Sequence, residues 1–107
     1  MSKPNIIVIG GGLAGLMAAL KAAEMGATVQ IFSLVAPKRS HSACAQGGIN
    51  GAINTLGQGD SPEYHFEETI YGGDFLANQQ IVKDFCYAAP GIINLLDRMG
   101  VTFNRTK

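Results

Sequence analysis

Three glycines near the start of the chain have the spacing of a phosphate-binding loop. Gly10, Gly12 and Gly15 form the pattern G-x-G-x-x-G. In such a loop the first glycine permits a tight turn, the second lets the backbone approach a pyrophosphate, and the third lets helix and strand pack closely. Free N–H groups at the start of the helix then attract phosphate oxygens. We therefore expect the whole loop to bind a dinucleotide: Gly10, Gly11, Gly12, Leu13, Ala14 and Gly15.

The residues around this loop predict the elements that the motif requires. Residues 5–9 (NIIVI) form an uninterrupted β-branched run, typical of a strand covered on both faces in a parallel sheet. Residues 13–25 have helical periodicity, and Gly26 is a natural residue to end the helix. Residues 28–32 (TVQIF) predict a second strand, which completes a βαβ unit. A glycine-rich turn without a ligand is the alternative, and this context disfavours it.

The residue after the second predicted strand departs from the usual pattern. An Asp or Glu commonly holds the adenosine ribose there, whereas this chain has Ser33. A hydroxyl can still bind ribose, but less strongly than a carboxylate. The serine argues mildly against NAD and leaves FAD possible.

The segment that follows, residues 33–59, is rich in small and polar residues and shows little periodicity. A loop of this length inside a compact domain is usually functional or disordered. Its central stretch, R-S-H-S-A-C-A-Q-G-G-I-N, begins at Arg39 and places His41 among small residues. Small residues would let the backbone lie against a flat ring system. The plain alternative is a loop histidine that makes an ordinary hydrogen bond.

The rest of the chain predicts helices. Ser61 is a good N-cap, and Gly100 would end the last helix. Residues 101–104 could begin a strand, and the sequence stops soon afterwards, at Lys107, which suggests an incomplete domain. The helical patterns cover residues 62–71, 78–88 and 90–99.

Composition excludes some classes of function. Eight basic and eight acidic side chains give a formal net charge of +0, so no basic field exists for nucleic acid. Cys44 and Cys86 lack the spacing of a zinc site. Two free thiols in a reducing cytoplasm are the default expectation, and one disulfide stays open. No targeting signal is evident, which favours a cytoplasmic location.

Four stretches of the chain resemble one known family closely. They are VIGGGLAG, KRSHSACAQGGINGA, DSPEYHFEETIYGGDFLANQ and LLDRMGV, and together they span nearly the whole chain. The pattern resembles the flavoprotein subunits of succinate dehydrogenase and quinol:fumarate reductase, and among these the bacterial, menaquinone-linked forms. The resemblance implies an α/β fold: a Rossmann-like, FAD-binding βαβ unit followed by a helical segment. Residues 1–107 would then be the N-terminal part of the FAD-binding domain, without the capping and C-terminal domains.

The resemblance also implies specific roles for residues. In the family, the histidine of the R-S-H-[ST] motif is bonded covalently to the 8α carbon of the flavin, and His41 occupies that position. The surrounding residues line the FAD. Carried over to this chain, the lining residues are Ser33, Lys38, Arg39, Ser40, His41, Ser42, Ala45, Gln46, Gly47 and Gly48.

The implied activity is the interconversion of succinate and fumarate. Electrons would pass to an iron–sulfur subunit, with a membrane cytochrome b anchor, at the cytoplasmic face of the membrane. The family's dicarboxylate-binding and proton-transferring residues lie beyond position 107, so no catalytic residue is expected in this chain. Two alternatives stay open: a non-catalytic truncated product, and an L-aspartate oxidase-like flavoprotein, a class that generally lacks the linking histidine.

Overall fold

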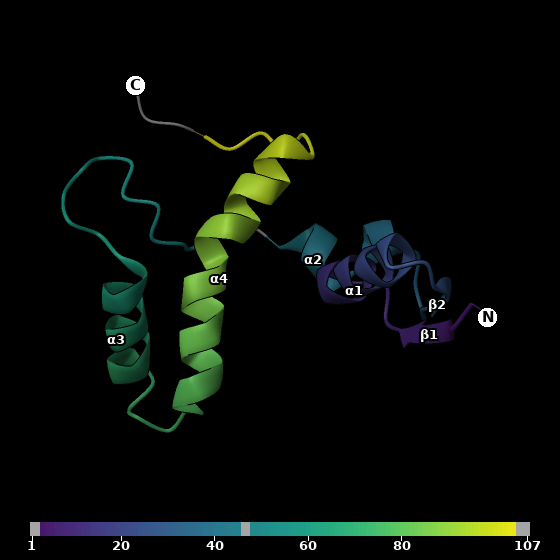
Figure 1. The fold of residues 1–107 in the computed structure, drawn as a ribbon, viewed down its shortest axis with the longest axis horizontal. Coiled ribbons are helices and arrows are strands. Elements are labelled where there is room, and N and C mark those ends of the chain that lie inside the picture. The colour runs from purple at the N-terminus through teal and green to yellow at the C-terminus, as the bar shows by residue number, and fades with distance from the viewer. Residues whose placement is uncertain (1–2, 46–47, 105–107) are drawn as a thin grey trace. The chain divides into compact units, whose positions relative to one another are not determined.

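The computed structural model describes residues 3–45 and 48–104. The chain divides into two compact units, residues 1–47 and 48–107, and each is described by itself. The first unit combines strands and a helix, and the second is helical (Figure 1). The predicted α/β class is confirmed.

The first unit contains the predicted βαβ arrangement. β1 (Asn5–Ile9) leads into α1 (Leu13–Glu24), which returns the chain to β2 (Thr28–Phe32). The two strands pair in parallel, with Asn5 opposite Thr28 and Ile9 opposite Phe32. Both strands have the predicted bounds, because short β-branched runs bounded by glycine or by a helix leave little choice of register.

α1 ends one residue earlier than predicted, at a left-handed glycine. Gly26 has φ +89°. Its N–H donates to Ala23 O at 2.9 Å, and the N–H of Ala27 donates to Ala22 O at 3.0 Å. These two bonds define a Schellman motif, which satisfies the last carbonyls of the helix and turns the chain towards β2.

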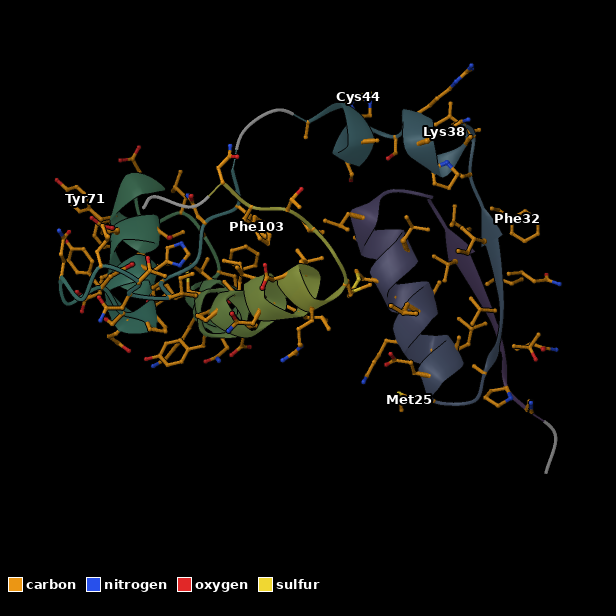
Figure 2. All side chains as sticks on the ribbon, turned by 90° about the horizontal axis from the view of Figure 1, so that it is seen from above. Met25, Phe32, Lys38, Cys44, Tyr71 and Phe103 are labelled. Carbon is orange, nitrogen blue, oxygen red and sulfur yellow. The ribbon has the colours of Figure 1, made fainter. Side chains whose placement is uncertain are left out.

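The expectation that the first strand is covered on both faces is wrong for the described residues. Ile9 is 88% exposed and Phe32 is 57% exposed, and Figure 2 shows Phe32 pointing away from α1. The reason is physical: α1 packs on one face, and the two short helices at Pro37–Arg39 and His41–Cys44 make no comparable contact with the strands. Two strands alone make a marginal sheet.

The segment after β2 is more ordered than its sequence predicts. It forms a short 3₁₀ helix, η1 (Pro37–Arg39), and one turn of α-helix, α2 (His41–Cys44). Ser40 caps α2 by accepting a hydrogen bond from the N–H of Ala43 at 3.3 Å. Elements this short carry no detectable periodicity, which is why the sequence suggested only a loop.

The second unit is built on α3 (Pro62–Gly72) and α4 (Gln79–Arg98), which pack side by side (Figure 1). As predicted, Ser61 caps α3; its hydroxyl accepts a hydrogen bond from Tyr64 N–H at 3.1 Å. The buried residues are small or aliphatic side chains of both helices and of the preceding loop: Ala52, Ile70, Cys86, Ala89 and Ile93.

Two predictions for the second unit are wrong. α4 is one helix of 20 residues that continues through Pro90, not two helices. Proline cannot donate to the Cys86 carbonyl, but Cys86, Ala89 and Ile93 lie on one buried face, and this packing maintains the helix. Residues 101–104 form no strand, because the described part of the second unit offers no strand for pairing. Gly100 does end α4, with φ +99°.

Candidate dinucleotide-binding site

The glycine loop turns the chain from β1 into α1. Gly10 has φ +115°, a conformation that side chains disfavour. Its N–H donates to the Phe32 carbonyl oxygen at 2.7 Å, which fixes the turn to the end of β2. The first glycine therefore has the conformational role that the motif predicts.

The third glycine permits close packing. A Cβ added at Gly15 would overlap the carbonyl oxygen of Gly10 and lie 3.1 Å from its carbonyl carbon. It would also lie 3.4 Å from Val8 Cγ1. Only a residue without a side chain lets α1 lie this close to the turn that leaves β1.

The second glycine borders open space at the start of α1. A Cβ added at Gly12 would meet only one atom within 4 Å, the Ser42 Oγ, at 3.3 Å. The first bond of the helical ladder runs from Leu16 N–H to Gly12 O at 3.0 Å, so the N–H groups of residues 13–15 precede it. The loop thus offers backbone donors beside a cradle that a larger side chain would begin to fill.

Two serine hydroxyls from later in the chain bind this loop. Ser33 Oγ accepts a hydrogen bond from Gly11 N–H at 3.2 Å, and Ser42 Oγ accepts one from Leu13 N–H at 3.0 Å. Gly12, the N-cap of α1, makes no side-chain cap of its own. The later segment therefore supplies the oxygen acceptors that the glycine-rich helix start lacks.

The basic and imidazole side chains of the predicted site lie on the two short helices. Lys38 and Arg39 belong to η1 and are exposed. Pro37, at the start of η1, would lie 3.5 Å from a Cβ placed on Gly11. Figure 2 shows Lys38 and Cys44 beside the end of α1 opposite Met25, which is its N-terminal end. Two positive charges near free N–H groups suit an anionic ligand.

His41 is the first residue of α2 and is exposed. Its neighbour Ser42 makes the bond to Leu13 N–H, so the chain places the imidazole one residue from a direct contact with the start of α1. An exposed imidazole close to a phosphate-binding loop can serve as a nitrogen nucleophile or a hydrogen-bonding group.

Most of the predicted site residues lie in the first unit. Gln46 and Gly47 are outside the described residues, and Gly48 belongs to the second unit. Pro37 was not predicted; its signal was a proline between the second strand and the basic pair, where it fixes φ at the start of a turn. The described predicted residues of the first unit are Gly10, Gly11, Gly12, Leu13, Ala14, Gly15, Ser33, Lys38, Arg39, Ser40, His41, Ser42 and Ala45.

The second unit has a cavity of about 540 Å³, but its lining includes few side chains suited to catalysis or to binding a cofactor. The walls include the apolar residues Ile53, Ile93 and Phe103 and the polar residues Asn94 and Asp97. No group of three or more potential metal ligands occurs in residues 3–45 and 48–104. The glycine loop is therefore the stronger candidate site.

A parallel strand–glycine loop–helix–strand unit with open donors at the helix start defines a dinucleotide-binding protein. The sequence model of one family, described as the FAD binding domain, matches residues 5–107. The chain belongs to this FAD binding domain family.

Within this family, the chain is similar to flavoprotein subunits of two named enzymes. The chain is 71% identical to the succinate dehydrogenase flavoprotein subunit of Bacillus subtilis over 99% of its length, which is 18% of that protein. It is 39% identical to the fumarate reductase flavoprotein subunit of Helicobacter pylori, over 96% of its length and 15% of that protein. The chain thus spans less than a fifth of these relatives.

Solved structures agree with the fold. The Mycobacterium smegmatis Sdh1 complex in its apo form matches with a TM-score of 0.91 and 32% identity, covering 100% of this chain and 18% of that one. Escherichia coli quinol fumarate reductase matches with a TM-score of 0.84 and 34% identity, over 96% of this chain and 18% of that one. Among the described residues, no helix is both long enough and apolar enough to cross a membrane.

Proposed function

We propose that this chain provides the FAD-anchoring part of a flavoprotein subunit that interconverts succinate and fumarate, with the flavin attached covalently to His41. One observation carries the proposal: the Ser42–Leu13 hydrogen bond brings the His41 helix to the start of α1, where the glycine loop would hold a pyrophosphate. The 71% identity to a succinate dehydrogenase flavoprotein subunit supports the choice of substrate.

The residues present fit FAD. Backbone N–H groups of residues 14 and 15 and the dipole of α1 would hold the pyrophosphate, since Leu13 N–H already donates to Ser42 Oγ. The open space at Gly12 lets phosphate oxygens approach the backbone. The Ser33 hydroxyl, directly after β2, accepts from Gly11 N–H and would donate a hydrogen bond to the adenosine ribose. Lys38 and Arg39 would add positive charge near the phosphates. The small residues of α2 and its flanks would let the backbone lie against the ring system.

The flavin, when bound, supplies the two-electron redox chemistry between succinate and fumarate. The chain's residues hold it, orient it and set its electronics. A covalent bond at the 8α position would raise the oxidising power of the flavin, which removal of hydrogen from an unactivated C–C bond requires. His41 would therefore act on the potential as well as on retention of the cofactor.

The partners follow from the same proposal. The named relatives are subunits of succinate dehydrogenase and fumarate reductase, which implies partner subunits for this chain. We propose that these are an iron–sulfur subunit and a membrane cytochrome b anchor, with the assembly at the cytoplasmic face. A dicarboxylate would be the substrate. An L-aspartate oxidase-like function is weaker, because that class generally lacks the linking histidine.

Residues 1–107 alone are proposed to be inactive, since the family resemblance assigns the dicarboxylate-binding groups to later positions. Succinate-dependent dye reduction by the purified 107-residue chain would contradict this.

The experiment that tests the function uses the complete native polypeptide. Flavin is measured in the pellet and supernatant after acid precipitation, together with succinate-dependent dye reduction. We expect yellow flavin in the wild-type pellet and succinate-dependent turnover. In His41→Ser, flavin should move to the supernatant. A wild-type pellet without flavin would refute the covalent attachment, and absence of turnover with succinate would refute the substrate.

A further inference from the structure

We infer that Ser42 is the residue that positions His41 for attachment to the flavin. Its hydroxyl joins α2 to the N-terminus of α1. The inference rests on the proposed function, because it requires His41 to be the attachment site.

The contact replaces a cap that α1 lacks. Gly12 has no side chain to accept a hydrogen bond from the first N–H groups of α1. Ser42 Oγ accepts one from Leu13 N–H at 3.0 Å, across 29 residues of sequence. The same Oγ would lie 3.3 Å from a Cβ at Gly12, so a glycine there leaves room for the hydroxyl.

α2 needs such an external contact to keep its place. It is a single turn of four residues, and isolated helices of that length are unstable in water. Ser40 caps the turn internally, but that bond does not connect it to α1. Within residues 3–45, the hydrogen bond between Ser42 and Leu13 is the one that joins α2 to α1.

The helical geometry of α2 lets Ser42 contact α1 while His41 projects from a different face. Successive residues on an α-helix project about 100° apart, so a serine that faces α1 leaves the preceding histidine on a different face. His41 is exposed, which fits a side chain available to a ligand. Attachment depends on holding the reacting atoms in an attack geometry, and small displacements slow such reactions greatly.

Attachment would form a C–N bond between a ring nitrogen of His41 and the 8α carbon of the flavin. The imidazole N–H and the 8α methyl group would each lose a proton, and the two electrons left on the flavin would pass to a two-electron acceptor, such as dioxygen or a quinone. Ser42 takes no part in these bond changes; it fixes where the imidazole lies.

The test uses Ser42→Ala, Ser42→Thr and a matched control, Ser61→Ala, in the complete native polypeptide. Ser61 makes the same kind of serine-to-backbone bond, at 3.1 Å, at the start of α3. Each apoprotein is incubated with FAD and an acceptor, and the covalent share of the bound flavin is followed over time. This ratio does not depend on how much flavin each variant takes up.

We expect the rate of covalent attachment in Ser42→Ala to fall about fivefold. This is the change in rate that results when the typical free energy of an N-cap bond, about 1 kcal/mol, is added to the barrier for attachment. Ser42→Thr keeps the hydroxyl and should restore the rate, and Ser61→Ala should match the wild type. A wild-type rate in Ser42→Ala, or an equal loss in Ser42→Thr, would overturn the inference while leaving His41 as the attachment site. Absence of covalent flavin in the wild type would overturn both.

Discussion

Replacement of Gly15 by alanine tests the packing of the glycine loop. An added Cβ would overlap the Gly10 carbonyl oxygen and lie 3.1 Å from the carbonyl carbon. The carbonyl cannot move freely, because Gly10 N–H is bonded to Phe32 O at 2.7 Å and the residue already has φ +115°. α1 must therefore move away from β1, which would distort the phosphate-binding loop.

Two opposing effects set the magnitude of this change. Alanine in a helix is favoured over glycine by roughly 0.5–1 kcal/mol. Overpacking a well-packed site typically costs about 1–3 kcal/mol, and overlap with backbone lies at the upper end. We therefore expect Gly15→Ala to lower the free energy of unfolding by about 1–2 kcal/mol, and to weaken FAD binding.

Gly91→Ala is the matched control. Gly91 lies within α4, and a Cβ there would meet nothing within 4 Å. The same substitution should stabilise the protein slightly through helix propensity alone. The assay compares thermal unfolding midpoints of both variants with the wild type, by circular dichroism and flavin fluorescence. If Gly15→Ala proves as stable as Gly91→Ala and binds FAD normally, the close-packing argument is wrong.

Three further predictions concern the loop, the attachment site and the helical unit. Gly12→Val should abolish FAD binding, since its side chain would occupy the space for phosphate; unchanged flavin stoichiometry would contradict this. His41→Ser should slow succinate oxidation more than fumarate reduction, because an unlinked flavin has a lower potential; rates in both directions decide, and equal losses would remove the potential argument. The Glu63 carboxylate accepts a hydrogen bond from the Tyr87 hydroxyl, which raises the pKa of Tyr87 above 10.0. The raised value favours the neutral phenol, so the stabilisation is present below pH 10.0 and lost as pH rises through the higher pKa. The free energies of unfolding of wild type and Tyr87→Phe should therefore differ at neutral pH and converge at high pH. A difference that stays constant with pH would contradict this.

The sequence predicted the first unit well because its signals are local. The strand bounds at residues 5–9 and 28–32 are confirmed, and the helix between them differs by one residue at Gly26. The glycine spacing located the turn, since the positive φ at Gly10 and the close approach at Gly15 both require a residue without a side chain.

Prediction from the sequence failed where contacts between residues far apart in the chain determine the structure. The Ser42–Leu13 bond spans 29 residues, and no periodicity reports it. Pro90 predicted a break, yet the packing of one face of α4 keeps the helix continuous. The strand expected at residues 101–104 lacks a partner within the described part of its unit. Local propensity was overridden in these places by packing and pairing.

Mass spectrometry of the peptide that carries His41 tests the central claim most directly. Trypsin cleaves after Arg39 and next after Lys83, which yields one peptide with both histidines of the chain. Cleavage after Glu63 then separates His41 from His65. Applied to the complete native polypeptide, the digest should show the mass of FAD added to the fragment with His41. An unmodified His41 fragment from flavin-loaded protein, or flavin on the fragment with His65, would contradict the account.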